Sequence, residues 1–176
     1  MIKQFKYILF FLIFISCKTN SDNIKVNSVK INYNILYNGE NYFKEALTIL
    51  KDNYSSNYWD IIPLVEEMEY SRDENIIPTK NFEKAEEKAI KAIQKSKNNQ
   101  IKILDRAYLL LGNSRFYDQR YIASLQALGQ VLERKDEAIL WKVMIYLNLD
   151  QIDLALKIIT DELKTRNKDQ INIAVS

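Results

Sequence analysis

The sequence predicts an all-α protein, a solenoid of about three helical hairpins. Apolar residues recur at intervals of three and four along most of the chain, which is the spacing of one helix face. Short polar segments separate these stripes, as turns between paired helices do. Only three glycines and two prolines occur in 176 residues, so few positions would break a helix.

Composition argues against several classes of site. The chain has no histidine and one cysteine, Cys17, so zinc sites, disulfides and histidine-based nucleophile systems are not expected. It has 25 basic and 23 acidic residues, but Lys3 and Lys6 lie in the first 16 residues, which hold no acid. The remainder carries 23 charges of each sign, and this balance argues against a nucleic-acid partner. We expect no metal, no cofactor and no small-molecule substrate.

The amino terminus has the features of a signal peptide, which we assign to residues 1–16. Two lysines precede an apolar run from Tyr7 to Ile15, shorter than the roughly 20 residues that a membrane-spanning helix needs. The run is followed by a small residue, Ser16, directly before Cys17, and this arrangement resembles the lipobox of bacterial lipoproteins. The resemblance implies cleavage before Cys17 and lipidation of its sulfur; a plain secretion signal is the alternative. Residues 17–25 are polar, and we expect a flexible tether there.

We expect a first helical hairpin at residues 26–51 and an irregular connection at residues 52–80. The hairpin has two apolar stripes separated by Asn38-Gly39-Glu40, where glycine serves as a helix stop signal. The connection contains turn-forming residues, two prolines and a run of acids from Glu66 to Glu74. This run lacks the spacing of a calcium loop, so a solvated acidic loop is expected.

Residues 81–164 carry the clearest helical pattern. A first helix begins at Asn81, a favourable capping residue, and has an apolar stripe from Phe82 to Ile93. Two hairpins follow, with turns at Asp118-Gln119-Arg120 and Asp150-Gln151. The first helix of the second hairpin is expected to start at a capping acid, Asp136. Beyond these hairpins, residues 165–176 show little periodicity, and we expect a frayed tail.

Spacing within these hairpins resembles the tetratricopeptide repeat, which has an aromatic residue and Leu-Gly in its first helix and Ala-x3-Phe in its second. Three residues, Tyr108, Leu111 and Gly112, match in order and spacing, and Ser124 and Leu128 stand at the positions of the alanine and the phenylalanine. Ala46 and Ala155 repeat the small position of Ser124, and Ser124 and Ala155 are 31 residues apart, near the repeat length of about 34. We expect these seven residues to pack the repeats, with Gly112 and Ser124 allowing two helix backbones to approach closely. Arg115 and Asp136 depart from the aromatic residue and the proline of the signature.

Longer phrases between Lys30 and Arg134 resemble the amino-terminal region of the SprE/PorW family of Bacteroidota lipoproteins. The phrases are NILYNGENYFKE, YWDIIP, NFEKAEEKAIKAIQK and DRAYLLLGNSRFYDQRY, which begin at Asn34, Tyr58, Asn81 and Asp105. The resemblance implies a repeat scaffold of type IX secretion and gliding motility, lipid-anchored in the outer membrane and facing the periplasm. Members of that family are several times longer than this chain, so a truncated form is an alternative.

A stack of hairpins leaves a concave surface made by the first helix of each pair. We expect a partner-binding groove there, formed by Arg106, Leu109, Asn113, Phe116, Tyr117, Met144, Leu147 and Asn148. Phe116 and Tyr117 are the main candidates, because rigid aromatic side chains dominate binding hot spots. The alternative is that both pack against the following helix.

The function expected from these features is protein binding in the cell envelope, not catalysis. The partners would be envelope or secretion-machinery proteins, and the membrane contact would be the lipid anchor. A repeat lipoprotein of another envelope assembly, such as outer-membrane protein insertion, is the alternative. The sequence has no glycine-rich phosphate loop and no Gly-x-Ser-x-Gly motif, which leaves an enzyme of the cell wall a distant third.

Overall fold

The computed structural model describes residues 28–54, 59, 77–97 and 100–175. Across these ranges the chain is helical and has no strand, which confirms the all-α prediction. The elements are η1, a π-helical segment (Ile31–Leu36), and the α-helices α3 (Tyr37–Asn53), α4 (Ile77–Lys95), α5 (Ile101–Tyr117), α6 (Tyr121–Leu128), α7 (Lys135–Asn148) and α8 (Ile152–Val175). The predicted signal peptide 1–16, the tether 17–25 with its lipidation site Cys17, and the acidic part of the connection 52–80 lie outside the described residues.

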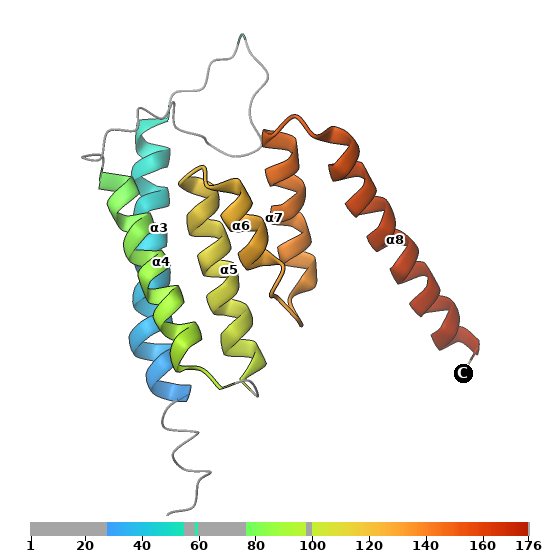
Figure 1. Cartoon of the computed structure of the whole chain (residues 1–176), viewed down its shortest axis with the longest axis horizontal. Coiled ribbons are helices and arrows are strands. Elements are labelled where there is room, and N and C mark those ends of the chain that lie inside the picture. Colours follow the sequence, from blue (N-terminus) through green and yellow to red (C-terminus); the bar gives the residue numbers. More distant parts are fainter. Residues whose placement is uncertain (1–27, 55–58, 60–76, 98–99, 176) are drawn as a thin grey trace, which may run out of the picture.

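Consecutive helices pack side by side in three pairs, α3 with α4, α5 with α6, and α7 with α8 (Figure 1). α5 lies at the centre, because it contacts α3 and α7 in addition to its chain neighbours α4 and α6. α8 packs against α7 and then diverges from the rest of the molecule (Figure 1). The described fold therefore has a densely packed end at α3 to α5 and a projecting helix at the other end.

The predicted hairpin at residues 26–51 is wrong, because residues 28–53 form one continuous helical segment. The backbone passes from η1 into α3 and through Asn38-Gly39-Glu40 without a turn. Gly39 is buried, and a Cβ atom placed on it would lie 2.8 Å from Leu110 Cδ2 and 2.9 Å from Lys88 Cβ. This glycine allows α3 to approach α4 and α5 closely instead of ending a helix, and the partner of α3 is α4.

The start of α4 also differs from the prediction. The helix begins at Ile77, so Asn81 lies one turn inside it and is 8% exposed, and it is not a cap. Pro78 falls in the first turn, where a proline is tolerated because the first N–H groups have no partner within the helix. The predicted apolar stripe is confirmed, since Phe82 and the alanines that follow it in α4 are buried.

Two further helix boundaries need correction near the carboxyl end. α7 begins at Lys135, so Asp136 lies in its first turn and is not the cap, although an acid there still interacts favourably with the helix dipole. α8 continues to Val175, so the backbone of residues 165–175 is helical and not a frayed tail.

Two main clusters of buried side chains form the core. The first joins η1, α4, α5 and α6 through Ile31, Ile35, Leu36, Ala85, Ala89, Ala92, Ala107, Leu110, Leu111 and Ala127. The second joins α5, α6 and α7 through Leu109, Phe116, Leu128, Val131, Ala138 and Ile145. α5 and α6 both contribute to the two clusters, but α5 supplies five of these buried residues, more than any other described helix, and for that reason it organises the fold.

The predicted close approach of α5 and α6 is confirmed. The Ser124 hydroxyl donates a hydrogen bond of 2.6 Å to the Gly112 carbonyl oxygen, and Ser124 is fully buried. A Cβ atom on Gly112 would lie 2.7 Å from both Cγ and Cδ2 of Leu128, closer than packed carbon atoms approach. The two small residues are therefore what allows these backbones to meet.

A buried carboxylate fixes the connection from α6 to α7. Asp105 of α5 is fully buried and accepts three hydrogen bonds from backbone N–H groups, those of Leu132 (2.9 Å), Glu133 (2.7 Å) and Arg134 (2.9 Å). Hydrogen bonds to a carboxylate are stronger than those between neutral groups. The central helix thus determines where the next hairpin begins.

Candidate interaction surface

The protein's own side chains fill most of the predicted groove. Leu109 and Phe116 are 3% and 2% exposed, so the prediction that they contact a partner is wrong. The Phe116 ring lies 5.2 Å from the Trp141 ring and 5.7 Å from the Tyr121 ring, both in edge-to-face contact. The cause is that α7 packs on the face of α5 that carries these residues.

The other groove positions are mostly engaged as well. Tyr117 stacks on Phe82 with ring centroids 5.2 Å apart and lies edge-on to Phe43 at 5.7 Å. Arg106 forms an ion pair of 2.7 Å with Glu40. Asn113, Met144 and Leu147 are half-buried, which leaves Asn148 as the one exposed residue among the eight. The structure therefore does not bring the predicted groove together as an open surface.

Six of the seven residues predicted to pack the repeats are buried, namely Ala46, Leu111, Gly112, Ser124, Leu128 and Ala155, and Tyr108 is half-buried. The prediction missed Trp141, which the structure places against Phe116 and Tyr117. The inner face of α7 carries Ala138, Trp141 and Ile145, spaced three and four apart. This spacing could have identified the inner face of α7 from the sequence. A second apolar stripe of α7, which includes Leu140, has the same period, so periodicity alone does not distinguish the two faces. In the structure Leu140 is 58% exposed.

A group of charges joins α4 to the turn between α5 and α6. The Glu86 carboxylate accepts a hydrogen bond of 2.9 Å from Arg115 Nε and is also paired with Arg120, which in turn pairs with Asp118. Arg115 also donates to the Ala123 carbonyl oxygen at 3.1 Å. Burial raises the pKa of Glu86, but the hydrogen bonds and positive charges of Arg120 and Arg115 outweigh burial, so the pKa lies below its ordinary value. These four charged residues, which we name the Glu86 clamp, attach α4 to the α5–α6 turn.

The turns of the last two hairpins have the same backbone geometry. In the α5–α6 turn, Asp118, Gln119 and Arg120 donate N–H hydrogen bonds to residues four, three and five positions earlier. In the α7–α8 turn, the three residues 31 positions further on donate to the three corresponding carbonyl oxygens. The middle residues, Gln119 and Asp150, have φ angles of 56° and 55°. The hairpin therefore recurs at the same 31-residue interval that separates the buried Ser124 and Ala155.

α8 exposes one apolar face. Ala155 is 2% exposed and faces the body, but four large apolar residues at spacings of four, three and four remain largely exposed. They are Ile152 (57%), Leu156 (56%), Ile159 (40%) and Leu163 (57%), and we name them the α8 stripe. At about 100° per residue they fall within one narrow sector of the helix, beside the sector that holds Ala155. The α8 stripe is the principal unpartnered apolar surface among the described helices.

Comparison with known proteins supplies no further constraint. No protein-family model and no curated protein matches the sequence. The geometry of the α8 stripe and the sequence patterns are therefore what indicate an interaction surface.

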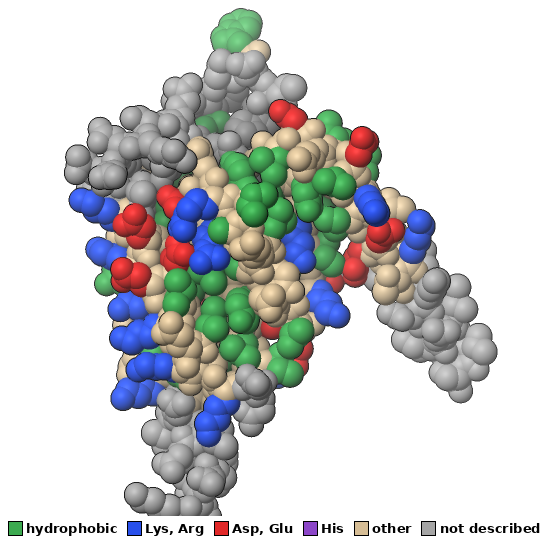
Figure 2. Space-filling model, viewed as in Figure 1, with side chains coloured by type: hydrophobic (Ala, Val, Ile, Leu, Met, Phe, Trp, Pro, Cys, Tyr) green, Lys and Arg blue, Asp and Glu red, His purple; other side chains and the backbone are tan. Residues whose placement is uncertain are grey.

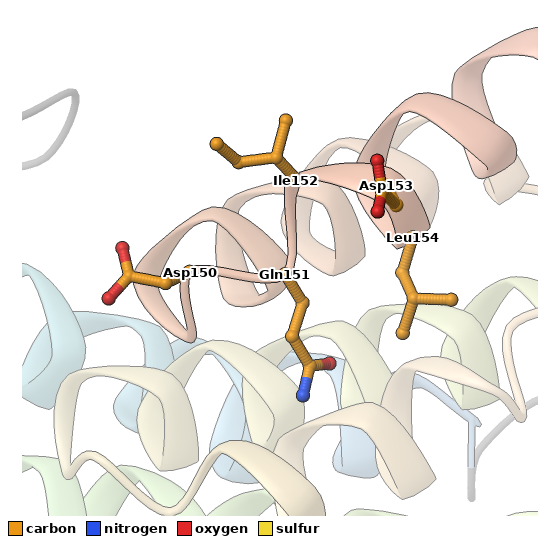
Figure 3. A pocket seen from close by; sticks show the side chains of 5 residues that line it. All are labelled: Asp150, Gln151, Ile152, Asp153 and Leu154. Carbon is orange, nitrogen blue, oxygen red and sulfur yellow. The ribbon is translucent and has the colours of Figure 1, made fainter.

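A hollow lies beside the start of the α8 stripe (Figure 3). It has a volume of about 550 Å³ and is lined by the consecutive residues Asp150 to Leu154. Gln151 and Leu154 extend toward the neighbouring helices, whereas Ile152 points away from them (Figure 3). One short segment lines the hollow, namely the α7–α8 turn and the first turn of α8.

The described part of the chain contains no group of three or more acidic, cysteine or histidine side chains that could hold a metal ion. None of its helices is long and apolar enough to cross a membrane.

Proposed function

We propose that the protein is a lipid-anchored scaffold with tetratricopeptide-like hairpins that binds other proteins in the bacterial envelope. The observation that supports this most strongly is the recurrence of one hairpin, with the same turn hydrogen bonds, at an interval of 31 residues. Stacked hairpins of this kind typically present extended surfaces to protein partners. The α8 stripe supports a binding role, because contiguous exposed apolar residues commonly mark interaction sites.

The cellular setting that we propose is type IX secretion or gliding motility. Support comes from the sequence resemblance between Lys30 and Arg134 and from the lipobox-like arrangement at Cys17. The chain would be anchored in the outer membrane through two or more acyl chains, because one chain alone holds a protein only marginally. Outer-membrane protein insertion is the other envelope assembly that the same features would suit.

The test is affinity purification from crosslinked cells, with the membrane and soluble fractions analysed separately. We expect the wild-type chain in the membrane fraction, together with components of the secretion machinery. We expect Cys17→Ser to move the protein to the soluble fraction and to reduce recovery of those components about tenfold or more, because the acyl chains that depend on the cysteine are lost.

The matched control is Ser16→Ala, which keeps a small residue before the cysteine and should leave the protein in the membrane fraction. Recovery of outer-membrane insertion proteins in place of secretion proteins would favour the second assembly. Membrane retention of Cys17→Ser would contradict the anchor, and the absence of any specific envelope protein would contradict the scaffold.

A further inference from the structure

We infer that the α8 stripe is a docking site for an amphipathic α-helix of a partner protein. This inference rests on the proposed scaffold function and deepens it by naming the surface and the kind of partner. The surface consists of Ile152, Leu156, Ile159 and Leu163, which extend over about three helical turns, roughly 16 Å along the axis.

The internal repeat shows what normally covers such a stripe. A shift of 31 residues places Ile152, Leu156 and Ile159 on the α6 positions 121, 125 and 128. Those three residues of α6, an aromatic residue and two leucines, pack in the second core cluster, where α7 covers them. Because the two turns have the same hydrogen bonds, α8 leaves its turn as α6 does. The α8 stripe therefore has the form of a surface that accepts one more helix.

α7 also indicates the chemistry of the helix that would fit. Its inner face places a small residue, Ala138, an aromatic residue, Trp141, and a large aliphatic residue, Ile145, at spacings of three and four. The small residue lets the backbones approach. The larger two bury apolar area in the cluster that holds Leu128 of α6, where Trp141 lies against the Phe116 ring of α5. We therefore expect a partner helix with a small, an aromatic and an aliphatic residue at these spacings.

Among the described residues, the outward side of α3 at the opposite end offers no comparable apolar stripe to a second copy, because its exposed apolar residue, Tyr37 (56% exposed), stands among polar neighbours. The outward side of α3 is formed largely by polar and charged residues, including Asn38, Lys44, Glu45, Thr48, Lys51 and Asp52, all exposed. Charged side chains also follow the α3–α4 edge in Figure 2. Head-to-tail stacking would bury these charges against the α8 stripe, which is unfavourable without partners. The observations thus favour a helix of another protein over head-to-tail stacking of a second copy of this chain.

The experiment uses a fluorescent peptide with the sequence of α7, residues 135–148, titrated with the purified full chain and followed by fluorescence anisotropy. We expect saturable binding, with an affinity about tenfold or more weaker for Leu156→Glu, because a charge would face the apolar side of the peptide. The matched control is Leu132→Glu, since Leu132 is also 56% exposed but lies outside the stripe. Circular dichroism should show that both variants melt as the wild type does.

Three results would overturn the inference: no saturable binding of the peptide, equal binding to the two variants, or a dimer in sedimentation that Leu156→Glu dissociates. Equal binding would mean that the peptide occupies another surface, and the dimer would make a second copy the occupant. The measurement needs neither the anchor nor the envelope, so it can succeed where the cellular purification fails. Conversely, the purification can succeed while the peptide does not bind.

Discussion

Gly112 is the position where a single added methyl group should matter most. The methyl group of Gly112→Ala would lie 2.7 Å from Leu128, so α5 and α6 must separate. We expect the free energy of unfolding to fall by about 1–2 kcal/mol, because overpacking outweighs the gain of about 1 kcal/mol in helix propensity. Urea unfolding followed by circular dichroism measures the change.

Gly129 provides the control for this substitution. Its backbone is in the right-handed helical region, with φ −67° and ψ −18°, and the nearest atoms to an added Cβ are carbonyl oxygens at 3.4 Å. Gly129→Ala should leave stability unchanged or raise it by up to about 1 kcal/mol, since alanine restricts the unfolded chain. Equal losses in the two variants would refute the close-packing explanation of Gly112.

The two glycines Gly112 and Gly39 show which packing contacts could be predicted from the sequence and which could not. Small residues in the middle of two adjacent apolar stripes were enough to predict the contact of Gly112 with Ser124. Gly39 could not be interpreted in the same way, because a glycine beside polar residues is typical both of a helix end and of close packing. Only the positions of Leu110 and Lys88, distant in sequence, distinguish the two.

Among the helices, the Glu86 clamp makes the attachment of α4 to the α5–α6 turn sensitive to pH. The pKa of Glu86 is lowered in the folded protein, so its stabilising contribution is present above the unfolded value of about 4.3. That contribution is lost as the pH falls through the folded pKa. We expect Glu86→Gln to lower the free energy of unfolding by about 1–2 kcal/mol at pH 7, because charged hydrogen bonds are replaced by neutral ones.

Urea unfolding of wild type and Glu86→Gln at pH 7 and at pH 3 tests this. The difference between the two proteins should shrink at the lower pH, because pH 3 lies below the unfolded pKa of about 4.3 and protons then bind preferentially to the unfolded wild type. Glu87→Gln is the matched control, since Glu87 is the exposed neighbour on the same helix, and its effect should be small. A difference that stays constant between the two pH values would show that the charge of Glu86 is not the cause.

Helix positions were easier to predict than helix neighbours. The turn at Asp118 to Arg120 follows from a polar break between two stripes, a local signal. The face of α5 that α7 covers is set by Trp141 and Ile145 from a later helix, and for that reason Phe116 was placed in a groove when it lies in the core. Periodicity identified the apolar residues of α8, but it could not show that the described helices leave the α8 stripe exposed.

For the whole molecule, the distribution of contacts predicts a gradient of local stability. α5 contributes to both main clusters, whereas α8 packs against α7 and buries Ala155 alone among its described apolar residues to below 9% exposure. Elements with few buried contacts open with a lower free energy than the core. We expect amide hydrogens of α8 to exchange at least about tenfold faster than those of α5, measured by hydrogen–deuterium exchange with mass spectrometry.

Exchange in the presence of the α7-sequence peptide gives the corresponding control, since a helix docked on the α8 stripe should slow exchange there and leave α5 unchanged. Protection of α8 equal to that of α5 in the isolated protein would contradict the gradient.

The two ends of the fold differ in one further way that concerns stoichiometry. The α3 side presents exposed charges, and the α8 side presents exposed apolar residues. Among the described helices, the α8 side alone presents such an apolar stripe, so the described fold has a valence of one for helix stacking and would terminate a row of stacked helices. With the docking proposed here, the complex would stop at one partner per chain, and the chain would act as an end piece that limits the size of the assembly it joins.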